Sequence, residues 1–176
     1  LHFQLHYTPN GKVTKDRTRI GLRFAKKPPK ETIRVIPVAN KRISIPSGAP
    51  NHIETASRSI PRNLTVRAFM PHMHLRGKAF KYELVGTDGS RETLLDVPRY
   101  DFNWQLRYVL KEPRTIPAGS RIEVTGTFDN SEKNPANPNP ETAVRWGDQS
   151  DDEMLIGYVE CAIDTSTVGN ESSAVD

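Results

Sequence analysis

The sequence of 176 residues contains a single cysteine, Cys161, so no disulfide can form within the chain. It has no apolar run close to the roughly 20 residues of a membrane-spanning helix, and almost no stretch with helical periodicity. A hydrophobic core must therefore hold the fold, and a chain of this length can bury one. The first residues read as part of a strand without a signal peptide, so we expect a truncated start with any targeting segment missing.

Several signatures of catalytic and binding sites are also missing. The sequence has no glycine-rich loop for phosphate, no recognisable Ser-His-Asp spacing and no cysteine pair for zinc. Acidic residues are scarce at the start, where residues 1–42 hold 11 Lys and Arg but only 2 Asp and Glu. Such a segment can contact a polyanion. Because these charges are scattered along alternating strands without interleaved aromatic platforms, we expect a solvated or domain-contacting face and no nucleic-acid partner.

Short β-rich runs separated by Pro and Gly make up most of the chain. They recur at intervals of about 8–12 residues, which is typical of sandwiches and barrels. The pattern predicts an all-β fold, an antiparallel, jelly-roll-like β-sandwich. The strands are expected at 1–8, 16–25, 33–38, 41–45, 52–60, 64–75, 79–85, 91–97, 100–110, 121–128, 144–147 and 153–163.

Composition divides the chain into three parts. A Lys-Lys-Pro-Pro run at 26–29 predicts a boundary near residue 30. Residues 1–30 are then expected to be the last strands of a preceding domain, and residues 31–164 the main sandwich. Residues 165–176 are small and polar and are expected to form a disordered tail.

A His-x-His pattern, formed by His72 and His74, follows directly on a strand-like run. Residues i and i+2 of a strand share one face, with Cα atoms about 6.5–7 Å apart, so two imidazoles can converge on one metal ion. A third ligand must come from elsewhere, and we place it at Met154. The carboxylates at 151–153 are the alternatives. A carboxylate would favour zinc or non-haem iron, whereas a thioether selects Cu(I); packing in the core is the other interpretation of Met154.

The remaining histidines and the residues that follow His74 bear on two other interpretations, a second site and a cupin. His2 and His6 share one face of the first expected strand, so they could belong to a second site. The cupins, another jelly-roll metal family, also contain His-x-His but need a nearby Glu and a later His. Here the next Glu after His74 is Glu83 and no histidine follows, which argues against a cupin.

Three separated motifs resemble those of the copper type II, ascorbate-dependent monooxygenases (the peptidylglycine α-hydroxylating and dopamine β-monooxygenase family). They are Phe3–Tyr7, His72–Lys78, and Ser150–Met154 followed by Tyr158. Further segments at 100–105, 116–119 and 129–131 make the chain most similar to the C-terminal domain of bacterial members. The resemblance extends over nearly everything up to residue 163.

The resemblance implies a protein of two β-sandwich domains, each binding one copper ion that cycles between Cu(I) and Cu(II). It implies that His72, His74 and Met154 form the copper site where O2 binds and a substrate C–H bond is hydroxylated, with Tyr158 retained as a catalytic residue. His6 would match a ligand of the other copper, which takes electrons from ascorbate or an equivalent donor. The other ligands of that copper would lie in an upstream part missing from this chain, so residues 1–30 would be the last strands of a truncated N-terminal copper domain and residues 31–164 the C-terminal copper-binding domain.

Two positions depart from the family pattern. Met70 stands where peptide-amidating members have an Arg that holds the substrate carboxylate, and Ile156 replaces an Asn. Without that bidentate clamp, we do not expect a glycine-extended peptide as substrate, and a different small molecule is expected to react with O2. A periplasmic or extracellular location follows from the resemblance alone.

Two other functions stay open on the sequence. The same fold could be a non-catalytic copper-binding or electron-relay module. It could also be a metal-free domain for adhesion or carbohydrate contact, with Tyr100, Trp104 and Tyr108 lining a sugar surface. We expect these aromatic residues to pack in the core and hairpins instead.

Overall fold

The computed structural model describes residues 3, 5, 7, 9–27 and 31–164. Within this part of the chain, no helix is long and apolar enough to cross a membrane. The elements, in chain order, are β1 (Glu31–Ala39), β2 (Ser44–Ile45), β3 (His52–Ser59), β4 (Leu64–His72), β5 (Gly77–Val85), β6 (Arg91–Val97), the 3-10 turn η1 (Phe102–Trp104), β7 (Tyr108–Ile116), β8 (Arg121–Phe128), β9 (Val144–Arg145) and β10 (Ile156–Asp164).

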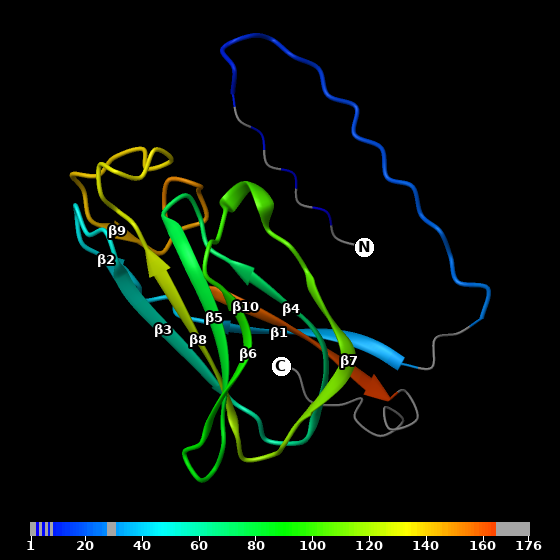
Figure 1. Ribbon diagram of the computed structural model, residues 1–176. Coiled ribbons are helices and arrows are strands. Elements are labelled where there is room, and N and C mark those ends of the chain that lie inside the picture. Colours follow the sequence, from blue (N-terminus) through cyan, green and yellow to red (C-terminus); the bar gives the residue numbers. More distant parts are fainter. Residues whose placement is uncertain (1–2, 4, 6, 8, 28–30, 165–176) are drawn as a thin grey trace, which may run out of the picture.

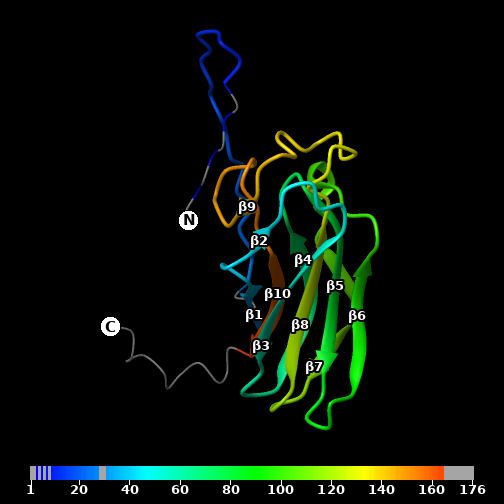
Figure 2. The same ribbon diagram turned by 90° about the vertical axis from the view of Figure 1, so that its left-hand side faces the viewer.

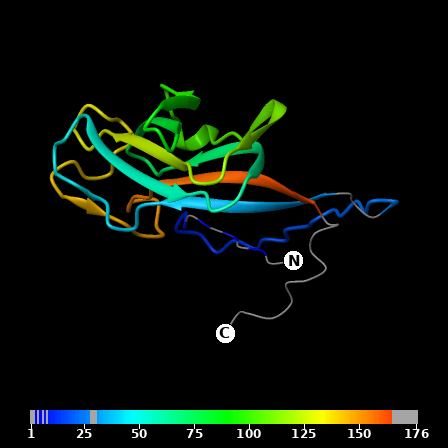
Figure 3. The same cartoon turned by 90° about the horizontal axis from the view of Figure 1, so that it is seen from below.

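The strands form two four-stranded sheets and one small pair. One sheet, here called the β4 sheet, has the order β1-β10-β4-β7, and the other, the β8 sheet, has the order β3-β8-β5-β6, while β2 pairs with β9. The strand pairs within all three sheets are antiparallel. Figure 3 shows β1 and β10 in one layer and β3 and β8 in the other. The prediction of an all-β antiparallel sandwich is confirmed.

The core lies between the two layers because alternate residues of each strand point inward. In β8, Ile122, Val124, Gly126 and Phe128 are buried, whereas the residues that alternate with them are at least partly exposed. Phe69 of β4 meets Tyr82 of β5 across the layers, with ring centroids 4.8 Å apart. Each large apolar side chain buried in this way contributes about 1.5–3 kcal/mol to folding.

Antiparallel pairing of β4 with β10 determines where the histidine segment lies. The register places His72, the last residue of β4, opposite Ile156, the first residue of β10. In Figures 1 and 2, β4 ends and β10 begins at the end of the sandwich that also carries η1. The chain just after β4 and the chain just before β10 are therefore neighbours, although about 80 residues separate them in the sequence.

The strand expected at 16–25 is wrong, since residues 9–27 contain no strand. Alternating apolar residues become a strand only where a neighbour supplies the ladder hydrogen bonds, and no described strand pairs with this run. The turn expected at residues 9–12 does form, with Gly11 at a φ of 73°, and the Tyr7 hydroxyl donates to Asp16 across it at 2.7 Å. Most of the strand expected at 1–8, and the tail at 165–176, lie outside the described residues.

The strand expected at 100–110 is also partly wrong. Residues 102–104 form the 3-10 turn, capped by Asp101, and the strand begins only at Tyr108. This turn breaks the alternation that would have placed Tyr100, Trp104 and Tyr108 on one face. Tyr100 is buried in the core as expected, and Tyr108 packs against it, but Trp104 is 69% exposed, so the expectation that it packs inside is wrong.

Gly157 of β10 tests how tightly the two layers pack. A Cβ atom at this position would meet Val124 Cγ1 at 2.6 Å and Tyr82 Cε1 at 2.8 Å, both from the β8 sheet. We therefore expect Gly157→Ala to lower the free energy of unfolding by about 1–3 kcal/mol through overpacking, measured from urea denaturation midpoints. Gly21→Ala is the control, because nothing lies within 4 Å of a Cβ there; an equal loss in both variants would contradict the packing argument.

Candidate metal centre

His72 and His74 lie side by side at the end of β4. Their ring centroids are 5.2 Å apart and the ring planes are nearly perpendicular, at 83°. The strand expected to continue to residue 75 ends at His72. The following backbone is still fixed, because the Tyr100 hydroxyl donates to Met73 O at 2.6 Å and accepts from Met73 N–H at 3.0 Å. The two imidazoles are thus held close together beyond the end of the ladder.

Hydrogen bonds at the Nδ1 atoms determine which nitrogen of each ring is available. His74 Nδ1 lies 3.2 Å from the carbonyl oxygen of Asp152, which can only accept, so Nδ1 carries the hydrogen. His72 Nδ1 lies 2.7 Å from Oε1 of Gln105, whose amide is oriented by donation from Nε2 to Phe102 O at 2.9 Å. Both rings therefore present the lone pair of Nε2, the arrangement that outer partners impose on metal-binding histidines.

The surroundings of His74 favour its neutral ring. His74 is 5% exposed and His72 is half-buried, and the ring of Phe102 approaches His74 with its centroid 6.0 Å away. Burial, and after it the nearby His72, lowers the pKa of His74. Because a metal ion needs the unprotonated nitrogen, this environment prepares the ring for coordination at neutral pH.

Alternation of side chains leads us to expect Met154 on the same face of the β4 sheet as the two histidines. On the inner face, Met73 and Leu155 both reach over Gly126 of the other layer, where a Cβ would meet their side chains at 3.0 and 2.7 Å. Side chains alternate between faces, so the residues on either side of Met73 and Leu155 belong to the outer face. Met154 is half-buried and lies two residues before the start of β10.

Glu153 fastens the two ligand-bearing segments together. This fully buried carboxylate accepts the backbone N–H of His74 at 2.8 Å and of Met154 at 3.2 Å through Oε2, and the N–H of Arg76 at 2.6 Å through Oε1. Burial raises the pKa of Glu153 to about 7, and the three N–H donors oppose that rise. Both oxygens of the carboxylate therefore already accept hydrogen bonds from the backbone.

The carboxylate alternatives to Met154 are disfavoured by this arrangement. Glu153 is occupied, the Asp152 carboxylate accepts from Gln149 N–H at 3.3 Å, and Asp151 is exposed. In the described part of the chain, no three His, Cys, Asp or Glu residues come together as a group that could hold a metal ion.

Tyr158 lies on the same outer face of the β4 sheet, two residues after Ile156 in β10. It pairs in register with Met70, as Ile156 pairs with His72, and its ring centroid is 6.3 Å from that of His72. Burial raises the pKa of the Tyr158 hydroxyl, so it stays a neutral donor. His6, the remaining candidate ligand, lies outside the described residues.

Sequence reasoning assigned no role to Arg76 and Asn130, which join three of the motifs. Arg76 is 2% exposed; its Nε donates to Asn130 Oδ1 at 2.8 Å and its Nη1 donates to Asp151 O at 2.8 Å. Asn130 in turn donates to two loop carbonyls, Pro46 O at 2.8 Å and Thr142 O at 2.9 Å. Both residues stand inside the family-like motifs, but their partners are 54 and 75 positions from Arg76, beyond the reach of local patterns.

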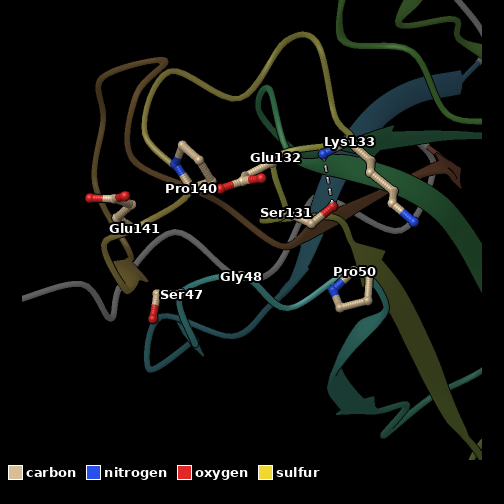
Figure 4. A pocket seen from close by; sticks show the side chains of 8 residues that line it. All are labelled: Ser47, Gly48, Pro50, Ser131, Glu132, Lys133, Pro140 and Glu141. Atoms are coloured by element: carbon tan, nitrogen blue, oxygen red, sulfur yellow. Dashed lines mark hydrogen bonds between the residues drawn. The ribbon is translucent and has the colours of Figure 1, made fainter.

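A hollow of about 460 Å³ lies near this end of the molecule but contains none of the expected site residues. Figure 4 shows it between the loop after β2 and the loop after β8, with Glu132, Lys133 and Glu141 around it. It is therefore separate from the histidine pair.

The bonding of Glu153 leads to a stability prediction that needs no metal. Glu153→Gln replaces one acceptor oxygen by an NH2 group that faces a backbone N–H, so we expect a loss of about 1–3 kcal/mol in unfolding free energy. Asp151→Asn is the matched control. The side chain of Asp151, two residues before Glu153, is exposed and makes no hydrogen bond to a described residue. The two variants are compared by denaturant unfolding of the metal-free chain, and equal midpoints would contradict the role given to Glu153.

One comparison with known proteins identifies a family. Residues 32–167 match the family described as copper type II ascorbate-dependent monooxygenase, C-terminal domain. The match spans β1 to β10 and includes His72, His74, Met154 and Tyr158. A comparison with curated proteins gives no match. Because the family match extends over most of the chain, the protein belongs to the copper type II, ascorbate-dependent monooxygenases and contains their C-terminal domain.

Proposed function

We propose that His72, His74 and Met154 together hold a copper ion on the outer face of the β4 sheet. The observation that carries this proposal is the pair of Nδ1 hydrogen bonds, which leaves both Nε2 lone pairs available on adjacent rings. The donor set fits copper, because two imidazoles and a thioether favour Cu(I), whereas zinc and iron sites prefer carboxylate or further nitrogen ligands. Membership of a copper family supports the same choice.

The proposed reaction is hydroxylation of a C–H bond with O2 and electrons from ascorbate or a similar reductant. Bound copper would supply the one-electron redox chemistry that this reaction needs. The protein's own part is to hold two imidazoles through their Nδ1 atoms and to keep a hydroxyl proton on Tyr158 beside them. His6 is proposed to serve a second copper together with an upstream domain, and an exported location is proposed to go with it.

The side chains beside the histidines indicate the kind of substrate. Met70 and Ile156, both on the outer face next to His72 or Tyr158, are apolar. Arg107 also lies on this face, but it is bound to Glu160 through two contacts of 2.6 Å, so its charge is already compensated. We propose that the substrate presents an apolar part to the centre and is not held by a carboxylate clamp.

Met154→Ala tests the thioether directly. We expect the affinity for Cu(I) to fall by about tenfold or more, which corresponds to about 1.4 kcal/mol, while the affinity for Zn(II) changes much less because zinc does not select a thioether. The measurement is an anaerobic Cu(I) titration against a competing chelator, together with X-ray absorption at the copper edge. The sulfur contribution to the copper spectrum should disappear in the variant.

Met70→Ala is the matched control, since it removes another thioether from the same face two residues before His72. It should leave the sulfur signal and both affinities unchanged. An equal loss of Cu(I) and Zn(II) in Met154→Ala, or a sulfur signal lost only with Met70, would sink the proposed ligand set. If copper binds as expected but the full-length protein shows no ascorbate-dependent O2 consumption, the site would belong to a non-catalytic copper module.

A further inference from the structure

A second hollow, of about 580 Å³, lies at the opposite end of the sandwich from the histidine pair. It is bounded by β1 and by the turn between β3 and β4, and Leu64, the first residue of β4, is part of its wall. His72 stands eight residues further along the same strand, about 26 Å away at the usual rise. β1 and β3 are edge strands of the two sheets, so the hollow opens where the layers are not closed by a further strand.

The base of the hollow is apolar and continuous with the core. Cys161 of β10 is fully buried and Ile60 is 2% exposed, and both line the hollow. Ile36 and Leu64 pack against the core next to them. A volume of this size, with an apolar base, falls in the usual range for small-molecule pockets.

The rim of the hollow is cationic. Arg34, Arg58 and Arg62 line it, and no Asp or Glu among the described residues does. None of the three arginines forms an ion pair with a described carboxylate. Within the described part of the chain, one side-chain hydrogen bond involves these arginines, donated by Arg58 Nη1 to Pro37 O at 3.3 Å.

Two of these arginines start from the inner faces of the sheets. Arg34 precedes Ile36, which faces the core, by two residues, and Arg58 follows Ala56, which is buried in the core, by two residues. Residues two apart in a strand share a face, and inner faces of a sandwich are normally apolar. Guanidinium groups therefore converge from both layers on the mouth of an apolar hollow.

We propose that this hollow binds one anionic amphiphile, a monocarboxylate with an unbranched alkyl chain. The chain would lie against Ile60, Leu64 and Cys161, and the carboxylate would be held by Arg34 and Arg58, whose forked donors match it. The proposal is independent of the copper centre, since it uses none of its residues.

The alternative explanation is that the arginines only protect the sheet edges. Inward-pointing charges on edge strands prevent association with other sheets. That role requires charge at the edge but no bound ligand. The two explanations therefore predict different results for ligand binding and for the removal of the charge.

Calorimetric titration of the metal-free chain with decanoate, kept below its micelle concentration, tests the proposal. We expect saturable binding of one decanoate, with decanol and decyltrimethylammonium binding at least about tenfold more weakly. Arg34→Gln and Arg58→Gln should each weaken decanoate binding by about tenfold or more. Arg99→Gln, which removes an exposed charge beside Tyr100 near the other end of the sandwich, is the control and should bind decanoate normally.

Three results would overturn the proposal. One is the absence of saturable decanoate binding by the unaltered chain. Another is equal binding of decanol, or equal weakening in Arg99→Gln, which would indicate non-specific adhesion. The third is normal decanoate binding by Arg34→Gln and Arg58→Gln together with their self-association in sedimentation, which would establish edge protection. Unchanged thermal unfolding of each variant verifies that a loss of binding is not a loss of fold.

Discussion

The buried carboxylate of Glu153 is the contact on which the metal centre depends. Ladder pairing between β4 and β10 stops at His72 and Ile156, and the proposed ligands His74 and Met154 lie just beyond that point. Glu153 takes over from the ladder by accepting N–H groups from both segments, at 2.6–3.2 Å. A buried carboxylate is costly unless it is fully hydrogen-bonded, so the charge and the three donors stabilise one another only in this arrangement.

The two faces of the β4 sheet have different tasks. Its inner face is packed against the β8 sheet so closely that Gly126 and Gly157 have no room for a Cβ. Interiors of this density do not deform gradually, which makes the inner face a rigid support. Its outer face carries His72, Met154 and Tyr158, where a ligand or another domain can approach. Because side chains alternate between the faces along β4 and along β10, each of these strands contributes to both faces.

Much of the fold and part of the site could be predicted from sequence. Strand positions followed from periodicity and turn residues, as in the hairpin of β5 and β6, and the adjacency of His72 and His74 followed from the two-residue spacing. The run at 16–25 has the same periodicity but no described partner strand, and periodicity alone cannot supply one. The roles of Glu153 and Gln105 were equally beyond reach, because each depends on a contact across 30 residues or more.

The errors around residues 100–110 show how a local turn can serve the site. A continuous strand would have directed Tyr100 and Trp104 to the same face. The turn at 102–104 instead leaves Trp104 exposed, keeps Tyr100 inside against Met73, and brings Phe102 and Gln105 to the two histidines. One irregular segment therefore anchors the backbone between the histidines from inside and orients their rings from outside. A regular strand could do only one of these, because its side chains at even spacing all point to one face.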